Sequence, residues 1–358
     1  MELSALGWTP DWSELFKPHL QAGLVPARVV TEDKHYYTVV SDTGPHLGQI
    51  TGKLHHRRLH PGQLPKVGDW VGIRIPEATD RVSIECVLPR RTQITRKIAG
   101  REAAVQVLAT NIDLALVVQA LGEPVNHRRL ERFLVMVHEG GAQPVVVLNK
   151  ADLCADPDPI TDEIRRIAGG HPVLVVSART GRALPRLREL LAPGTTAVIL
   201  GTSGVGKSSL VNRLYGERVQ PTLPVRERDS KGRHSTTARE LILLPNGSLI
   251  IDTPGLREFH LWSADDGLDV AFPDIAALAH QCRFRDCSHR TESDCAVRQG
   301  VTDGTLEASR LASYLKLRTE IDDVANRRQN QTWAANRRRS RTGTRAWLKR
   351  DEPDPDDS

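Results

Sequence analysis

The chain has 358 residues, enough for two or three domains, and its 39% hydrophobic residues and net charge of +5 are typical of a globular protein. The longest apolar runs, such as Leu114–Leu121, are strand-length and too short for the ~20 residues that cross a bilayer. The first residues lack the basic segment and apolar core of a secretory signal. We therefore expect a cytoplasmic monomer without a membrane partner.

Residues 1–24 are predicted to be an N-terminal extension in which Trp8 and Trp12 pack a short helix. From 25 to 90, short runs of alternating Val, Ile, Tyr and Thr are broken by Gly, Pro and Asp. The pattern predicts a β-barrel of about five strands, an RNA-binding OB-fold, although composition does not separate it from an SH3-like barrel. One barrel loop is expected to face RNA or solvent through His55, His56, Arg57, Arg58 and His60.

The next segment, PRRTQITRK at residues 89–97, is predicted to be a basic linker. After it, near-continuous apolar strands alternate with amphipathic helices. This rhythm indicates a parallel sheet with helices on both faces, so we expect an α/β domain over residues 91–260.

Inside this domain, residues 201–208 read GTSGVGKS between an apolar strand and a helix. Glycines let successive backbone N–H groups turn toward phosphates, and the helix N-terminus adds positive potential. Lys207 is expected to reach the β- and γ-phosphates of a nucleotide, and the Ser208 hydroxyl to ligate Mg²⁺. The residues predicted to bind GTP here are Gly201, Thr202, Ser203, Gly204, Val205, Gly206, Lys207, Ser208 and Ser209.

The sequence NKAD, Asn149 to Asp152, closes an earlier strand. A carboxylate at Asp152 can accept hydrogen bonds from guanine N1 and N2, which adenine cannot supply, so such a site rejects ATP. Asn149 is expected to brace the loop and Lys150 to lie along the base, and Ala151 is also expected to bind GTP. One strand later, Ser177 and Ala178 are expected to present a backbone N–H to guanine O6.

A further strand ends in IIDTPG, which predicts that Asp252 holds Mg²⁺ and that the Gly255 N–H senses the γ-phosphate. A switch ligand for Mg²⁺ is expected at Thr236 or Thr237, and the sequence leaves open which. Leu256 stands where many GTPases carry a water-orienting glutamine, so intrinsic hydrolysis should be slow. His234 is the candidate catalytic residue, with contact to RNA or solvent as its alternative role.

The base-reading motif precedes the phosphate loop by about fifty residues, the reverse of the order in an ordinary GTPase. Both motifs have the strand context they require, so neither is a coincidence. Because domain termini commonly lie close together, strands can keep their places in the sheet while the chain starts elsewhere. The domain is therefore predicted to be a circularly permuted P-loop GTPase.

Residues 261–325 are predicted to form a mostly helical zinc-binding domain. The spacing C-x4-C-x-H-x5-C is not the commonest zinc pattern, but three thiolates and one imidazole suit one tetrahedral, structural Zn²⁺. The expected ligands are Cys282, Cys287, His289 and Cys295. Residues 326–358 are a tail, basic and then acidic, expected to be disordered; its nine Arg or Lys suit a polyanion partner or a solvated chain.

With a barrel, a permuted GTPase and this Cys/His module in order, the chain resembles the bacterial ribosome-small-subunit-dependent GTPase A family. The resemblance covers about residues 25–323 and rests on NKAD, GTSGVGKSS, GRHSTT, DTPG and the Cys/His spacing. It implies a hydrolase that converts GTP to GDP in late maturation of the small ribosomal subunit. The enzyme would bind 30S particles and their rRNA, be stimulated by them, and leave on hydrolysis.

Two other functions stay open from the residues alone. One is an RNA-binding module or chaperone in which nucleotide occupancy only sets conformation. The other is a permuted GTPase that acts on a non-ribosomal partner. GTP turnover that is stimulated by small subunits would favour the ribosome-coupled GTPase over both alternatives. Salt-dependent RNA binding without such stimulation would favour the chaperone.

Overall fold

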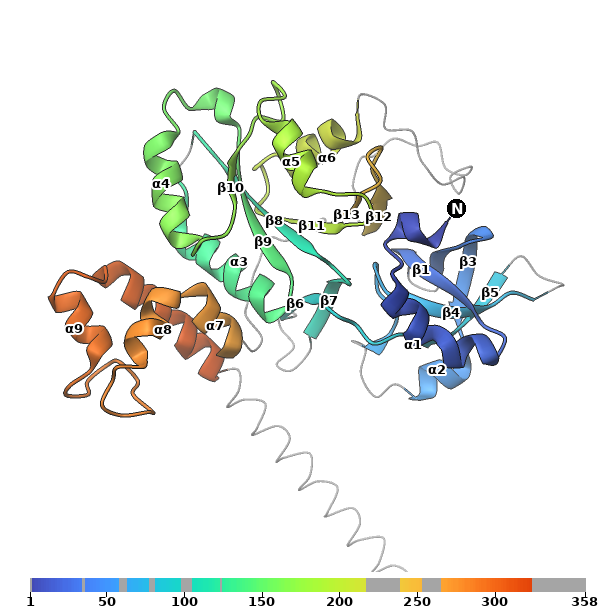
Figure 1. Cartoon of the computed structure of the whole chain (residues 1–358), viewed down its shortest axis with the longest axis horizontal. Coiled ribbons are helices and arrows are strands. Elements are labelled where there is room, and N and C mark those ends of the chain that lie inside the picture. Colours follow the sequence, from blue (N-terminus) through green and yellow to red (C-terminus); the bar gives the residue numbers. More distant parts are fainter. Residues whose placement is uncertain are drawn as a thin grey trace, which may run out of the picture.

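The computed structural model describes most of the chain, over residues 2–33, 36–57, 63–76, 81–97, 105–122, 124–216, 239–252 and 265–323. The predicted switch and γ-phosphate residues His234, Thr236, Thr237 and Gly255, like the tail at 326–358, lie outside these ranges. An N-terminal barrel and a group of C-terminal helices lie on opposite sides of a central α/β region (Figure 1). No helix in the described ranges is long and apolar enough to cross a membrane.

The N-terminal segment packs as a short 3-10 turn, η1 (Leu3–Leu6), followed by α1 (Pro10–Gln21). Proline is well tolerated at the start of α1 because the first N–H of a helix has no intrahelical acceptor. Trp12 and Phe16 are buried on its inner face, and the Trp8 ring stands edge-on to Trp70 of the barrel at 4.7 Å. The extension therefore belongs to the folded core, as the prediction of a packed helix implies.

Five strands form the barrel: β1 (Val25–Glu32), β2 (Tyr37–Ser41), β3 (Gly44–Ile50), β4 (Trp70–Arg74) and β5 (Arg81–Val87). They pair in the order β1-β2-β3-β5-β4, and β4 closes the barrel by pairing with β1. Alternate residues such as Val29, Val39 and Ile73 fill the interior. The predicted five-stranded OB-type barrel is confirmed. The predicted loop at residues 55–57 is instead the end of a helix, α2 (Gly52–Arg57).

The linker predicted at residues 89–97 is only partly a linker. Gln93–Lys97 forms β6, which pairs antiparallel with β7 (Val105–Thr110). Its polar residues hide the strand pattern, but Ile94 is fully buried and anchors it. At this junction the barrel also meets the central sheet, because Thr31 of β1 pairs with Glu240.

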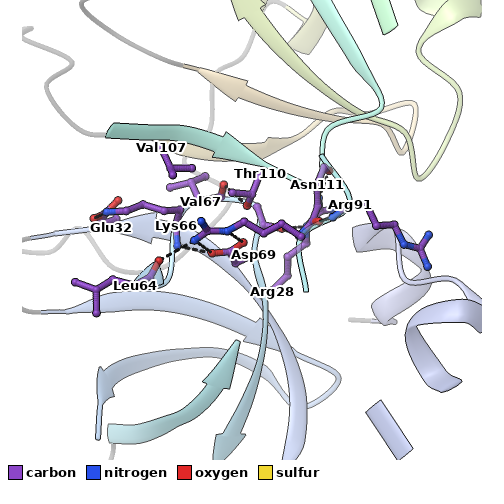
Figure 2. A network of polar contacts seen from close by, with 12 residues as sticks. Arg28, Glu32, Leu64, Lys66, Val67, Asp69, Arg91, Val107, Thr110 and Asn111 are labelled. Atoms are coloured by element: carbon purple, nitrogen blue, oxygen red, sulfur yellow. Dashed lines mark hydrogen bonds and ion pairs between the residues drawn. The ribbon is translucent and has the colours of Figure 1, made fainter. Parts of the chain in front are cut away.

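A buried arginine joins three parts of the chain at the same junction (Figure 2). The Arg28 guanidinium donates hydrogen bonds to the backbone carbonyls of Leu6 in the extension, Gly68 in the barrel and Asn111 before the central sheet. It also lies over the Trp70 ring, and burial lowers the pKa of Arg28 to about 10. Beside it, the fully buried Asp69 carboxylate accepts two hydrogen bonds from Arg90.

The central sheet has the order β10-β9-β8-β11-β13-β12. Its strands are β8 (Leu114–Ala120), β9 (Gln143–Asn149), β10 (Val173–Val175), β11 (Thr196–Leu200), β12 (Glu240–Leu243) and β13 (Leu249–Asp252). All are parallel except β12. Alternate strand residues pack against α3 (His127–Glu139) and α4 (Asp158–Ile167), and the others against α5 (Leu184–Leu190) and α6 (Lys207–Tyr215). The predicted doubly covered α/β fold is confirmed.

The C-terminal region is helical, with α7 (Asp265–Ala271), α8 (Pro273–Ala279), α9 (Ala296–Thr302) and a last helix over 308–323. It docks on α3 so closely that a Cβ at Gly267 would lie 2.8 Å from the Val135 carbonyl oxygen. Arg310 of the last helix pairs with Glu131 of α3 at 3.2 Å. Both side chains are largely shielded from solvent, and the pair connects the last helix to α3 of the central α/β region.

Candidate functional site

The predicted phosphate loop connects β11 to α6 in a conformation that requires glycine. Gly201, Gly204 and Gly206 have φ angles of 148°, 85° and 92°. A Cβ at Gly201 would lie 2.6 Å from the Val118 carbonyl oxygen, and one at Gly206 would overlap the Asn149 side chain. The loop is therefore held between β8 and the base-reading motif, with its backbone exposed toward the carboxyl ends of the strands.

Lys207 begins α6 and folds back over the loop. Its ammonium donates hydrogen bonds to the carbonyls of Gly201 at 2.9 Å and Thr202 at 2.7 Å. Burial lowers the pKa of Lys207, and the charge of Asp252 opposes that shift. Asp252 ends β13, which pairs with β11 so that Asp252 lies opposite Ile199. Cation, carboxylate and the exposed Ser208 therefore gather where β11 and β13 end.

Asn149 connects the three motifs that lie apart in sequence. Its side-chain oxygen accepts a hydrogen bond from the Ala178 N–H at 3.0 Å, and its amide nitrogen donates to the Val205 carbonyl at 2.9 Å. The residue is 1% exposed, so both bonds are shielded from water. One side chain thus holds the base-reading segments and the phosphate loop in a fixed relation.

The Asp152 carboxylate lies at the base-reading end in the short turn η3 (Ala151–Leu153). The Ser177 hydroxyl donates to it at 2.6 Å and, as the main cause, holds the pKa of Asp152 below its ordinary value. Lys150, just before η3, adopts the left-handed conformation with φ of 63°. Asp152 is therefore ionised at neutral pH and can accept donors from a base.

Two contributors at this site are absent from the motif-based prediction. The Arg179 guanidinium lies 3.7 Å from Asp152, although Arg179 is highly exposed and the pair is weak. The Val118 carbonyl leaves no room for a Cβ at Gly201, so it restricts the first position of the phosphate loop to glycine. A basic residue directly after the VSA motif is a sequence signal for Arg179, whereas nothing in the sequence marks Val118.

The predicted zinc ligands come together in the C-terminal region. One ligand atom from each of Cys282, Cys287, His289 and Cys295 lies within 4.8 Å of all the others. The Cys282 sulfur is 3.9 Å from that of Cys295 and 3.6 Å from His289 Nδ1, which is 3.4 Å from the Cys295 sulfur. Tetrahedral Zn²⁺ with ordinary bond lengths separates such ligands by about 3.5–3.8 Å, so the four residues fit a metal ion.

The loop that carries His289 is held by Glu292. Its carboxylate accepts hydrogen bonds from the backbone N–H groups of Ser288 at 2.8 Å and Arg290 at 2.9 Å. His289 itself has φ of 58°, an unusual conformation for a residue other than glycine. The surrounding fold therefore holds the imidazole in place.

Comparison with known proteins identifies the family of this chain. The profile of the RsgA GTPase family matches residues 87–262. A protein of Opitutus terrae named small ribosomal subunit biogenesis GTPase RsgA is 44% identical over 93% of this chain and 95% of its own length. A protein of the same name from Streptomyces coelicolor is 42% identical over 89% of this chain and 86% of its own.

Solved structures agree. YjeQ from Thermotoga maritima superposes with a TM-score of 0.63 at 29% identity, over 83% of this chain and 98% of that one. YloQ, described as a circularly permuted GTPase, gives a TM-score of 0.62 at 25% identity, over 84% of this chain and 96% of that one. The predicted circular permutation is thereby confirmed. From its motif order, its fold and these relatives, the chain belongs to the RsgA GTPase family.

Proposed function

We propose that this protein hydrolyses GTP in late maturation of the small ribosomal subunit, binding the subunit and its rRNA and leaving on hydrolysis. The observation that carries the proposal is the Asn149 contact set, which joins a base-reading motif to a phosphate loop. The names of close relatives supply the ribosomal context.

Guanine selection would come from Asp152, Lys150 and the Ala178 N–H. An ionised Asp152 accepts from guanine N1 and N2, whereas adenine would cover that acceptor without supplying a donor. Lys207 would exchange its two loop carbonyls for phosphate oxygens, which are stronger acceptors for an ammonium. The remaining residues from Gly201 to Ser209 would wrap the phosphates with backbone N–H groups.

A hydroxyl and a carboxylate beside the phosphates are a donor set that suits Mg²⁺. Ser208 and Asp252 would hold the ion, joined in the GTP state by Thr236 or Thr237. When bound, Mg²⁺ neutralises charge on the phosphate oxygens. Gly255 would contact the γ-phosphate, and His234 would orient water in place of the glutamine that Leu256 replaces.

The Cys₃His cluster would hold one structural Zn²⁺. All four ligand positions are filled by protein atoms, which leaves no open position for a substrate. The ion would stabilise the helical region by linking its loop to the start of α9.

We divide the chain into an extension at 1–24, an RNA-binding barrel at 25–90, the GTPase domain at 91–260, the zinc domain at 261–325 and the tail at 326–358. The barrel and the Arg-rich tail would contact rRNA. The protein would act as a monomer in the cytoplasm, where small subunits are assembled.

The test is GTP turnover by the purified protein alone and with small subunits, large subunits or bulk RNA. We expect stimulation by small subunits only, and its loss in Lys207→Ala. If small subunits bind while turnover stays flat, hydrolysis is not the step that the subunit triggers, and the RNA-chaperone function is favoured instead.

A further inference from the structure

A cavity of about 370 Å³ lies between α3, the phosphate loop and the last helix. This α3 groove is defined by Arg128, Arg129, Glu131, Thr202, Ser313 and Lys316. Thr202 belongs to the phosphate loop, so an occupant of the groove would lie beside the nucleotide site. Its volume is in the range of small-ligand pockets.

Basic side chains dominate the α3 groove. Arg128 and Arg129 come from the first turn of α3, and Lys316 faces them from the last helix. All three residues are exposed, and within the described ranges no carboxylate pairs with them. Arg132, which also lines the cavity, is held by Glu320 through two bonds of 2.6 and 2.8 Å. The groove thus presents three cations that are available to an anion.

The same cavity contains a buried acceptor. Glu131 is 4% exposed, and its Oε1 accepts from Arg310 at 3.2 Å. Burial raises the pKa of Glu131, and the Ser313 hydroxyl and the Arg310 charge oppose that shift. Oε2 is buried and has no hydrogen-bond donor among the described residues. A buried carboxylate oxygen without a donor is costly, so a ligand hydroxyl at this point would be favourable.

The required ligand therefore carries negative charge and, close to it, a hydroxyl donor. A ribonucleotide within an RNA strand meets both conditions through its phosphates and its ribose 2′-OH. A second cavity of about 650 Å³ shares Asn126, Arg128, Glu131 and Ser313 with the first and gives room for a neighbouring unit of the strand. Glu163, Asp274 and Glu307 also line this second cavity, so the phosphates belong in the α3 groove itself.

We propose that the α3 groove binds a single-stranded RNA segment, with phosphates on Arg128, Arg129 and Lys316 and a ribose hydroxyl donating to Glu131 Oε2. That this RNA is rRNA of the small subunit rests on the proposed function. Because Thr202 lines the groove, bound RNA would contact the loop that holds the GTP phosphates. Occupancy of the groove and nucleotide state would then influence each other reciprocally.

The test uses the full chain and two RNA probes, purified small subunits and a short oligouridine, with the 2′-deoxy oligonucleotide for comparison. Arg129→Ala/Lys316→Ala removes two groove cations. The matched control, Arg165→Ala/Arg186→Ala, removes two exposed arginines from α4 and α5. Ultraviolet crosslinking followed by peptide mass spectrometry locates the bound nucleotides, and GTP affinity is measured for every variant.

We expect nucleotide adducts on the first turn of α3 and on the last helix, and their loss in the groove variant but not in the control. The dependence of log affinity on log salt should become shallower by about 0.7 for each cation removed, as expected for single strands. Glu131→Gln should reduce the preference for RNA over the 2′-deoxy probe, because a neutral amide is the weaker acceptor.

Adducts confined to the barrel and the tail, or a salt dependence equal to that of the control, would overturn the proposal. So would crosslinks from the groove to a ribosomal protein only. If small subunits fail to stimulate wild-type turnover, the proposed function fails, while the oligouridine measurement still decides whether the groove binds RNA.

Discussion

Replacing Asn149 with alanine should weaken nucleotide binding strongly, because this side chain holds the base-reading motif and the phosphate loop together. The substitution leaves the Ala178 N–H and the Val205 carbonyl without partners in a place that is 1% exposed. A buried unpaired group costs about 1–3 kcal/mol. We expect the loops to relax to relieve this cost, and nucleotide binding must then restore them. A loss of about 2–4 kcal/mol corresponds to a Kd for GDP that is weaker by about 30- to 1000-fold.

The assay is calorimetric titration with GDP, paired with thermal unfolding at several GDP concentrations, because ligand-linked stabilisation depends on Kd. Asn149→Asp separates the two bonds, since it keeps the acceptor for Ala178 but directs a carboxylate oxygen at the Val205 carbonyl. Asn246→Ala is the control, because Asn246 also donates to a backbone carbonyl, that of Leu191 at 2.8 Å, away from the site. Unchanged GDP affinity in Asn149→Ala, with stability lowered as in the control, would refute the reasoning.

Four further predictions follow from the described contacts. Asp152→Asn should lower GTP affinity by about 100- to 1000-fold through the loss of charge-assisted bonds and shift preference toward xanthosine triphosphate, measured by competition binding. Arg28→Ala should lower the free energy of unfolding by about 3–5 kcal/mol, because three carbonyls lose a buried charged donor. Urea unfolding measures this loss, with Arg81→Ala as the control. Equal losses in the two variants would contradict the prediction. Burial lowers the pKa of His138 to about 4, so the unfolded chain binds a proton that the folded chain does not as pH falls from ~6.5 toward 4. Over this range we expect the free energy of unfolding to fall by about 1–2 kcal/mol after solvent screening. His138→Gln should give a flatter dependence of that free energy on pH. Purified protein should contain one zinc per chain by elemental analysis, and Cys287→Ser or a strong chelator should remove it and lower the unfolding temperature of the helical region.

The sequence predicts features that depend on local chemistry. Gly201 and Gly206 mark the phosphate loop because only glycine fits their φ angles and contacts. The alternation in β1 to β5 predicts a barrel because one face of each strand must be apolar. The Cys/His spacing brings four ligands together within one short loop region.

Features that depend on distant pairing escape the sequence. Strand β6 is polar, and only its partner β7 makes it a strand. Arg28 reads as an ordinary polar position in a β-strand, and its three carbonyl partners come from segments as far apart as Leu6 and Asn111. The contact between Arg310 and Glu131 spans 179 residues, and no periodicity indicates such a pair.

The strand order has a consequence for synthesis on the ribosome. Among the strands of the central sheet, β8 is synthesised first, followed by β9 and β10. One edge of β8 pairs with β9, but the other edge pairs with β11, which is synthesised later, and β13 follows later still. At roughly 5–20 residues per second, the nascent chain spends several seconds with the backbone edge of β8 unpaired. An unpaired apolar edge is the usual template for wrong association, so this interval is when the chain most needs protection. Nucleotide cannot supply that protection, because the phosphate loop follows β11 in the chain and emerges only after this partner of β8.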